Sequence, residues 1–543
     1  MRTARVGAAA APALLGLLLG ALALGPALGP GFVLRYDMVF VPDPPLTLPG
    51  QGFPRAVPSD LVVALLSQIA PAQAVQKAIL LGIFVLAASG AAALVPTGRL
   101  GPRLAAAAFY AWNAYLAQRL LLGQWALLLG VAGLPWAVRA ASLGGRLRLA
   151  VALLPAAVGG FQAILVSAVA VLATAATAPC AAAARVRRAA EAALILGGLS
   201  LPWLIPALLS EATTDPEGVD AFAARADGPF GVLGSLLGLG GIWNAHATVP
   251  GQGSWWSAGV RLVLAAVAVW GFVRLRARTR RPPAGGRDRD APPYWTGLAV
   301  AAGAGLAIAC LGAFAPGAMK VLIGWWPGFG PLRDGQLHLA SFALLQAVGL
   351  GGVVMGGVMD GAVDRAPGSP AGPVPGTRAV AAVAAVAAAV PVLVLPAFAM
   401  GAFGRLAAVD YPDEWRRVQA IVNADPAPGA LLSLPWGAHR AFGWNGGRVI
   451  LDPASKLFAR RVIWNDELLV GLPGGGRIAV AAEDPLVTRV GAVLRGRPDE
   501  RAEALAGLGV RYVLVHMSDN AFHGGVMLFQ GRELRLLRLD DRR

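Results

Sequence analysis

Apolar stretches of about 20 residues recur along the whole chain, and they limit the folds that it can adopt. A helix of that length crosses the roughly 30 Å of hydrocarbon in a bilayer. Only 14% of the 543 residues are charged, whereas soluble domains carry about 25%. Much of the surface must therefore face something other than water. We predict a polytopic α-helical membrane protein.

The predicted spans number about 11 and are separated by short polar segments. They are residues 9–29, 76–96, 101–118, 121–138, 148–159, 161–178, 189–210, 256–274, 296–316, 336–358 and 378–402. Residues 148–159 and 161–178 form either one long helix or two short helices broken at Gly159-Gly160. The first span follows a basic start and resembles a signal peptide. It lacks a convincing cleavage site before Gly31, so we expect it to remain as a span.

Basic residues cluster in the short segments between the predicted spans, as they do in cytoplasmic loops. The clusters are Arg2 and Arg5; Arg99 and Arg103; Arg139, Arg146 and Arg148; Arg185, Arg187 and Arg188; residues 274–281; and residues 365–378. All fall on one side of the cell membrane if residues 148–178 cross it twice. The net charge of +16 therefore indicates topology rather than nucleic-acid binding. The N-terminus is then cytoplasmic, and the last part of the chain lies outside.

The tail has a different pattern, which divides the sequence into a transmembrane domain of residues 1–404 and an extracytoplasmic domain of residues 405–543. One helical pattern begins at Asp413, whose carboxylate suits a helix N-terminus. A second helix is predicted at 499–508, and strands are predicted at 431–435, 448–451 and 509–515. Helices that alternate with short apolar strands favour a small α/β domain with a mixed or parallel sheet.

Asp37 is the first candidate catalytic residue. It follows the first span by a few residues, among apolar and aromatic side chains at the start of a long Pro-rich outside loop. A carboxylate held beside the membrane is partly desolvated, which raises its pKa and makes it a stronger base. The alternative is an ordinary solvated loop residue. Asp43 and Asp60 are further candidates in the same loop.

Arg119 belongs to a polar cluster at the outside junction of two predicted spans. No acid lies near it in the sequence, and the distribution of charge across membranes does not favour a cation on that side. Such a guanidinium can clamp a phosphate through two parallel hydrogen bonds. The alternative is a side chain that extends to the lipid headgroups.

A third polar group follows the pair Trp325-Trp326, which suggests an interfacial anchor. Arg333, Asp334, Gln336 and His338 gather there, in a turn rich in Gly and Pro just outside a predicted span. Ionisable groups near the membrane mark functional sites when they face the interior. These residues are therefore candidates for binding a substrate or donor phosphate, although a purely structural arrangement of Arg333 and Asp334 is an equal alternative.

The acidic outside loop of residues 211–255 contributes Trp243, Asn244 and His246. Their side chains could stack on a sugar and hydrogen-bond to it. The alternative, which we favour at this point, is that they only shape the loop.

Several kinds of site have no signal in the sequence. It contains no Walker A motif and no HExxH motif, and the five His residues are scattered. Cys180 and Cys310 lie in or beside apolar stretches, so neither a disulfide framework nor a Cys-based metal site is expected. No predicted span carries the several charges of a proton-coupled pump.

Together these features resemble the GT-C superfamily of polytopic glycosyltransferases, which use polyprenyl-phosphate-linked sugars on the outer face of the membrane. The shared features are the first span, the early acid Asp37 in a long outside loop, short paired helices and an outside tail. Within the superfamily the chain looks most like actinobacterial membrane proteins related to arabinofuranosyltransferases. The stretches that carry this likeness are WNAYLAQRLLLGQWALLL (112–129), PLRDGQ (331–336) and LGVRYVLV (508–515).

The resemblance implies an enzyme that transfers a sugar from a polyprenyl-phosphate donor to a cell-envelope glycan or lipid. It implies that Asp37 is the general base and that Arg119 or Arg333 neutralises the phosphate leaving group. The superfamily often places a second acid or polar residue after the first, but here Met38 follows Asp37. The sequence therefore assigns no cofactor, and it leaves a divalent metal open.

Two other classes of function fit the sequence. One is a transporter or flippase for lipid-linked glycans, which would need a continuous polar path through spans that carry few polar groups. The other is a non-catalytic envelope-assembly membrane protein whose outside domain binds a glycan or a partner. Substitution of Asp37 would leave the second of these unaffected.

Overall fold

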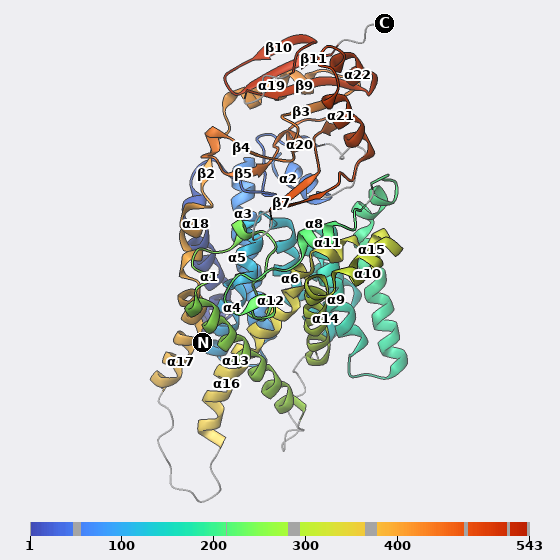
Figure 1. Ribbon diagram of the computed structural model, residues 1–543. Coiled ribbons are helices and arrows are strands. Elements are labelled where there is room, and N and C mark those ends of the chain that lie inside the picture. Colours follow the sequence, from blue (N-terminus) through green and yellow to red (C-terminus); the bar gives the residue numbers. More distant parts are fainter. Residues whose placement is uncertain are drawn as a thin grey trace, which may run out of the picture.

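The computed structural model describes residues 2–46, 56–212, 214–280, 294–363, 377–471, 476–517 and 522–539. Helices form the body of the molecule, and the strands of the tail gather at one end of it (Figure 1). The N-terminus lies toward the other end (Figure 1). The cytoplasmic loops predicted at 274–281 and 365–378 lie partly outside the described residues.

The longer helices make up most of the body. They are α1 (Arg2–Leu24), α3 (Ala72–Leu94), α4 (Leu100–Ala111), α6 (Trp125–Leu143), α9 (Phe161–Ala176), α10 (Ala182–Leu208), α13 (Trp255–Arg280), α14 (Trp295–Phe314), α16 (Ala340–Val363) and α17 (Thr377–Val394).

Shorter helical segments connect them. These are α2 (Ser59–Leu66), α5 (Ala114–Leu121), α7 (Arg146–Ala152), α8 (Leu154–Gly159), α11 (Gly218–Phe222), α12 (Gly231–Leu237), α15 (Pro316–Trp325) and α18 (Ala399–Gly404), with 3-10 turns η1 (Gly25–Leu28), η2 (Ala245–Ala247), η3 (Pro327–Arg333), η4 (Gly335–Leu339) and η5 (Pro396–Phe398).

Seven helices of the described residues are long and apolar enough to cross a membrane, or eight if a bent pair counts as one span. The seven are Ala9–Leu28, Ala72–Leu94, Trp125–Leu143, Ala182–Leu208, Trp255–Ala277, Trp295–Phe314 and Gly335–Gly356. The bent pair joins Ala382–Val394 to Pro396–Gly404 at an angle of 69°. A helical membrane protein is confirmed, but the predicted count of about 11 spans is not.

The predicted and observed numbers of spans differ because the chain interrupts some of the predicted spans. Asn113 accepts a hydrogen bond from the backbone N–H of Leu116 at 2.9 Å, which caps α5 and separates it from α4. The span predicted at 101–118 is therefore two short helices, and α5 with its polar residues is buried among other helices. The predicted break at Gly159-Gly160 is present, because Gly160 takes a φ of +80° between α8 and α9.

Two of the central helices, α13 and α16, pack at glycines. A Cβ on Gly349 of α16 would lie 1.9 Å from the carbonyl oxygen of Ala268 in α13. A Cβ on Gly271 would lie 2.3 Å from the carbonyl oxygen of Gly349. Small residues let two backbones approach closely where lipid offers no hydrophobic driving force. This contact therefore depends on the absence of side chains.

The tail carries nearly all of the strands. They are β1 (Phe32–Val33), β2 (Ala408–Val409), β3 (Ala430–Leu434), β4 (His439–Ala441), β5 (Val449–Leu451), β6 (Val462–Ile463), β7 (Leu468–Gly471), β8 (Arg477–Val480), β9 (Val510–His516), β10 (Val526–Gln530) and β11 (Leu534–Arg538). Its helices are α19 (Asp413–Ala424), α20 (Ala454–Leu457), α21 (Pro485–Arg495) and α22 (Arg501–Gly507), with a 3-10 turn η6 (Gly443–Asn445).

The main sheet has five strands in the order β10-β11-β9-β3-β6. Strand β3 runs parallel to β6 and β9, whereas β11 is antiparallel to β9 and β10, so the sheet is mixed as predicted. Alternate residues of β3 pack into different cores: Leu431 faces the core shared with the helical body, and Leu432 faces a second core with α21 and α22. Both faces of the sheet are thus covered.

The first loop after α1 is joined to the tail. Strand β1 pairs with β2, and Tyr36 exchanges backbone hydrogen bonds of 2.8 Å with Val449 and Leu451 of the β5 region. One apolar core also runs from the helices through Phe398 to Trp415. The domain boundary at residue 404 stays a prediction.

We expect Gly349→Ala to destabilise the protein by about 1–3 kcal/mol, because the new methyl group overlaps backbone atoms of α13. Thermal unfolding in detergent measures this. Gly303→Ala in α14 is the matched control, because a Cβ there meets nothing within 4 Å. Equal unfolding temperatures for the two variants would show that this helix contact is not tight.

Candidate active site

A cavity of about 2030 Å³ lies between the helical body and the tail. Its walls come from the first loop, from α9 and α10, from residues 212–253, from η3, and from the tail between β4 and α21. Pockets that hold one small ligand usually measure about 300–1,000 Å³. The cavity therefore has room for more than one ligand or for a large one.

One end of the cavity is apolar and open. Leu208, at the end of α10, and Trp326, before η3, line the cavity although 76% and 58% of their surfaces are exposed. Residues that both line a cavity and are exposed mark its mouth. Trp203 and Leu204 continue this apolar wall inward. The mouth therefore lies at the ends of apolar helices, where a lipid chain could enter.

Apart from the further candidates Asp43 and Asp60, six of the nine residues singled out from the sequence line this one cavity. They are Asp37, Trp243, Asn244, His246, Arg333 and Asp334. Asp60 also lines it, and its carboxylate pairs with Lys456 at 2.9 Å. Arg119, Gln336 and His338 are not part of the lining, and Asp43 is an exposed residue away from it.

Asp37 is held by its backbone and leaves its carboxylate accessible. Its N–H donates to the carbonyl oxygen of Leu122 at 3.3 Å, and His439 Nε2 lies 3.5 Å from its Oδ1. About 49% of the side chain is exposed. The desolvation expected for this carboxylate from its place beside the membrane is therefore not present in this structure.

Gly123 makes the close approach of the Asp37 turn possible. It adopts a φ of +84°, and a Cβ there would lie 2.3 Å from the carbonyl oxygen of Arg35 and 2.3 Å from the N–H nitrogen of Met38. Only glycine accepts both the backbone conformation and the contact. The sequence feature that places Asp37 is thus in the turn after α5, far from the loop that carries it.

Arg119 is fully buried and faces the carboxylate of Asp334, which lies 215 positions further along the chain. Its Nη1 and Nη2 donate to Asp334 Oδ2 and Oδ1 at 2.7 and 2.8 Å, in a bidentate pair. Nη1 also donates to Gln124 at 2.7 Å, and Nη2 donates to Gln336. Its charge is already neutralised, which favours a positioning role over phosphate binding.

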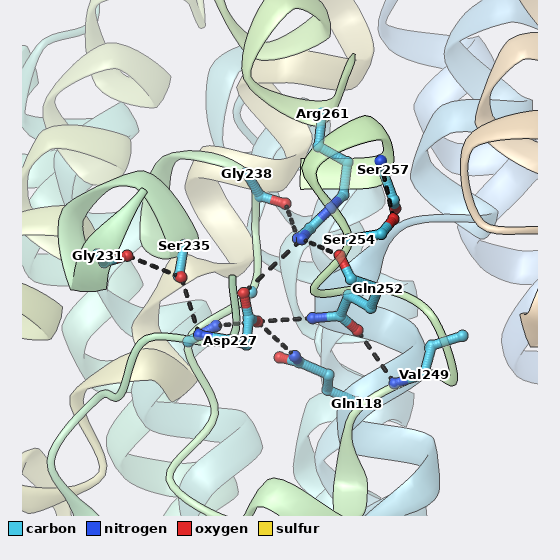
Figure 2. A network of polar contacts seen from close by, with 12 residues as sticks. Gln118, Asp227, Gly231, Ser235, Gly238, Val249, Gln252, Ser254, Ser257 and Arg261 are labelled. Carbon is cyan, nitrogen blue, oxygen red and sulfur yellow. Dashed lines mark hydrogen bonds and ion pairs between the residues drawn. The ribbon is translucent and has the colours of Figure 1, made fainter. Parts of the chain in front are cut away.

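A second buried ion pair lies behind the first. Figure 2 shows Asp227, whose Oδ2 accepts hydrogen bonds from Gln118 at 2.9 Å, from Gln252 at 2.6 Å and from the N–H of Gly241 at 2.7 Å. Arg261 of α13 approaches the other oxygen at 3.7 Å (Figure 2). Asp227 also lines the cavity.

Two glutamines join these ion pairs into one network. Gln336 donates to the Oε1 of Gln118 at 3.2 Å and accepts from Arg119. The polar path therefore runs from Arg261 through Asp227, Gln118 and Gln336 to Arg119 and Asp334. Gln118, Asp227, Gln252 and Arg261 are not among the residues predicted from the sequence. Arg261 had a signal, because it is a charge inside a predicted span and such charges usually have partners.

Of the other candidates, Arg333 and Trp243 lie on the cavity wall, whereas His338 is not part of the lining. Arg333 pairs with Glu483 of the tail at 3.0 Å and stacks over Phe222. Trp243 packs edge-on against the same Phe222, with ring centroids 5.0 Å apart. His338 is buried, and neither of its ring nitrogens has a hydrogen-bond partner.

No group of three or more His, Cys, Asp or Glu side chains that could hold a metal ion is present among the described residues.

The tail holds a buried polar cluster that only superficially resembles a hydrolytic triad. Ser433 Oγ and Asp452 Oδ1 lie 3.4 and 3.9 Å from the same nitrogen of His516, Nε2, whereas a triad uses both ring nitrogens. Arg440 pairs with Asp452 at 2.8 Å. All four side chains are buried under Trp415 and Phe442, so the cluster stabilises the tail rather than meeting a substrate.

Comparison with known proteins supports the fold. No family model and no curated protein matches the chain. The solved structure of the arabinofuranosyltransferase AftD from Mycobacteria matches 98% of this chain and 40% of its own, with a TM-score of 0.51 and 16% sequence identity. A mutant of the same protein matches 98% and 41%, with a TM-score of 0.50 and 17% identity.

The chain has the fold of this part of AftD. It spans about two fifths of the length of the solved protein. The resemblance to arabinofuranosyltransferase-related membrane proteins, expected from the sequence, is confirmed at the level of the fold.

Arg119→Gln should lower the free energy of unfolding by about 3–5 kcal/mol, because it leaves the Asp334 carboxylate buried without its partner. Adding Asp334→Asn should recover much of the loss. Thermal unfolding of both single variants and the double variant measures the coupling. Arg146→Gln is the control, since its pair with Glu191 is largely exposed. Additive losses at 119 and 334 would contradict the pairing.

Stability of the tail should fall below neutral pH. Burial lowers the pKa of His516 to about 4, although the nearby Asp452 partly opposes this shift. An unfolded His titrates near pH 6.5, so the unfolded chain binds more protons as the pH falls from about 6.5 to 4. We expect faster hydrogen exchange of β9, corrected for intrinsic rates, over that range. His516→Gln should flatten the profile, whereas His523→Gln, at a more solvent-accessible site, should not. A pH-independent wild type would overturn this account.

Proposed function

We propose that the protein is a membrane glycosyltransferase that moves a sugar from a polyprenyl-phosphate-linked donor to a cell-envelope glycan or lipid acceptor. The observation that carries the proposal is a single cavity with two unlike parts. One part of its opening is apolar and lies at the ends of apolar helices, and another part of its lining carries the accessible carboxylate of Asp37. A donor with a lipid chain and a polar head needs both.

The likeness to AftD supports the proposal through the fold. That protein is named an arabinofuranosyltransferase. A polyprenyl-phosphate arabinofuranose is therefore the first donor to test. The volume of the cavity leaves space for an acceptor beside the donor head group.

In the proposed reaction, Asp37 acts as the general base. The acceptor hydroxyl gives its proton to a carboxylate oxygen of Asp37 while its oxygen bonds to the anomeric carbon of the donor. The bond from that carbon to the phosphate oxygen breaks, and the electron pair leaves with the polyprenyl phosphate. The proton on Asp37 then passes to water, which the exposed side of the carboxylate can reach.

The remaining candidates take supporting roles in this proposal. Trp243, Asn244 and His246 line the wall where a sugar ring would stack and hydrogen-bond. Asp334 keeps its remaining lone pairs for sugar hydroxyls while Arg119 holds it in place. Arg333 lies at the junction with the tail, where it both pairs with Glu483 and faces the cavity.

We also propose that the reaction takes place outside the cytoplasm. The Arg clusters place the N-terminus in the cytoplasm by the usual distribution of charge. The tail lies at one end of the molecule, away from the N-terminus, and it lines part of the cavity (Figure 1). Residues 405–543 would then form an extracytoplasmic α/β domain that roofs the site.

Asp37→Asn should reduce sugar transfer by roughly a hundred- to ten-thousand-fold, because the amide cannot accept the acceptor proton. The assay uses the purified chain in nanodiscs with a polyprenyl-phosphate arabinofuranose and a glycan acceptor. Asp43→Asn is the matched control, since this residue of the same loop is exposed and outside the lining.

Wild-type transfer by Asp37→Asn would remove the proposed role of Asp37. Movement of labelled lipid across proteoliposome membranes without any covalent product would instead favour a transporter.

A further inference from the structure

Three arginines lie near one another where the first loop meets the tail, and among the described residues none of them pairs with a carboxylate. They are Arg35 in the first loop, Arg405 at the start of the tail and Arg448 before β5. Two other cations of the cavity differ: Arg333 pairs with Glu483, and Lys456 pairs with Asp60.

The guanidinium groups of Arg35 and Arg405 lie next to each other. Arg35 Nη2 and Arg405 Nη1 donate to the same acceptor, the carbonyl oxygen of His246, at 2.9 and 3.4 Å. Arg405 Nη1 also donates to the carbonyl oxygen of Thr248 at 2.6 Å. Neutral carbonyls satisfy hydrogen-bond donors without cancelling the charge, so two positive charges remain side by side.

Arg448 adds a third charge with unused donors. Its Nε and Nη2 are buried and have no hydrogen-bond partner. Burial, together with the charges of Arg405 and Arg448, lowers the pKa of Arg35, and burial lowers that of Arg448. Like charges that are partly desolvated and unpaired destabilise a folded chain unless an anion joins them.

The arginine cluster and the proposed base border the same cavity. Arg405, His246 and Asp37 all line it. Arg35 Nε donates to the carbonyl oxygen of Leu121 at 3.0 Å, and the N–H of Asp37 donates to the next carbonyl, that of Leu122. One turn after α5 therefore positions both a cation and the carboxylate.

We propose that Arg405, with Arg35 and Arg448 behind it, forms a binding site for a phosphate oxyanion. This rests on the proposed function, in which the phosphate is that of the lipid-linked donor. The site takes over the part that the sequence suggested for Arg119 and Arg333, whose charges are neutralised by Asp334 and Glu483. A phosphate held there stands beside Asp37 with an unopposed positive charge to receive the departing electron pair.

The test measures binding to the full chain in nanodiscs with three probes: a polyprenyl monophosphate, the corresponding polyprenol, and inorganic phosphate. The wild type should bind the lipid phosphate more tightly than the alcohol. Arg405→Gln should weaken binding of the lipid phosphate by about ten-fold or more, as loss of a charge-assisted contact does, and leave binding of the alcohol unchanged. Arg405→Lys should recover part of the loss.

Arg225→Gln is the matched control. Arg225 also lines the cavity and donates to a backbone carbonyl, that of Gly471, but it has no neighbouring guanidinium group among the described contacts. The Arg225→Gln variant should bind the lipid phosphate as tightly as the wild type does. Thermal unfolding of every variant confirms that the chain is folded before binding is compared.

The outcomes separate this site from the proposed function. Unchanged binding by Arg405→Gln, or a loss with Arg333→Gln in its place, overturns the arginine site while the glycosyltransferase stands. Binding of inorganic phosphate but not of the lipid supports the oxyanion site and contradicts the lipid donor. A wild type that binds neither form of phosphate overturns both.

Discussion

The buried pair of Arg119 and Asp334 is the interaction on which the rest of the site depends. It joins α5 to the turn before α16, across more than two hundred positions of the chain. A bidentate pair fixes direction as well as distance, because two parallel hydrogen bonds prevent rotation. Through Gln124 the same guanidinium also reaches the turn at Gly123, against which the Asp37 loop packs. Asp37 and Asp334 are thereby held in one frame, although they enter the cavity from distant segments.

The cavity is a junction between the body and the tail, and its shape depends on contacts between them. Arg333 reaches Glu483, Lys456 reaches Asp60, and the N–H of Ala481 donates to Asp215 at 3.0 Å. Hydrogen bonds of Tyr36 with the β5 region add a backbone connection beside Asp37. The tail thus forms part of the wall of the candidate site and does not act only as a separate binding module.

The sequence revealed the parts that depend on local patterns. Long apolar runs predicted a helical membrane protein, and the alternating tail predicted a mixed sheet, because both signals lie within short windows. The count of spans was not recoverable, since a single Asn cap at 113 divides the segment predicted as one span at 101–118. Candidate residues came from polar clusters near predicted span ends, and six of them reach one cavity. The hydrogen-bond and ion-pair partners of these residues could not be predicted, because a single sequence carries no signal of contacts between residues that are hundreds of positions apart.

Partners also decide which cavity carboxylate is free to act as a base. Asp334 accepts two bonds from Arg119, Asp227 accepts three bonds on one oxygen, and Asp60 pairs with Lys456. Each of these oxygens already accepts from a protein donor, so fewer of its lone pairs are open to a substrate hydroxyl. Among the described residues, the side chain of Asp37 has one close ionisable neighbour, His439, at the longer distance of 3.5 Å. When the carboxylates of one site differ in this way, those with several hydrogen bonds hold other groups in position. The carboxylate with few contacts is the one available to accept a proton. The environment of Asp37 therefore favours it as the base on grounds independent of its place in the sequence.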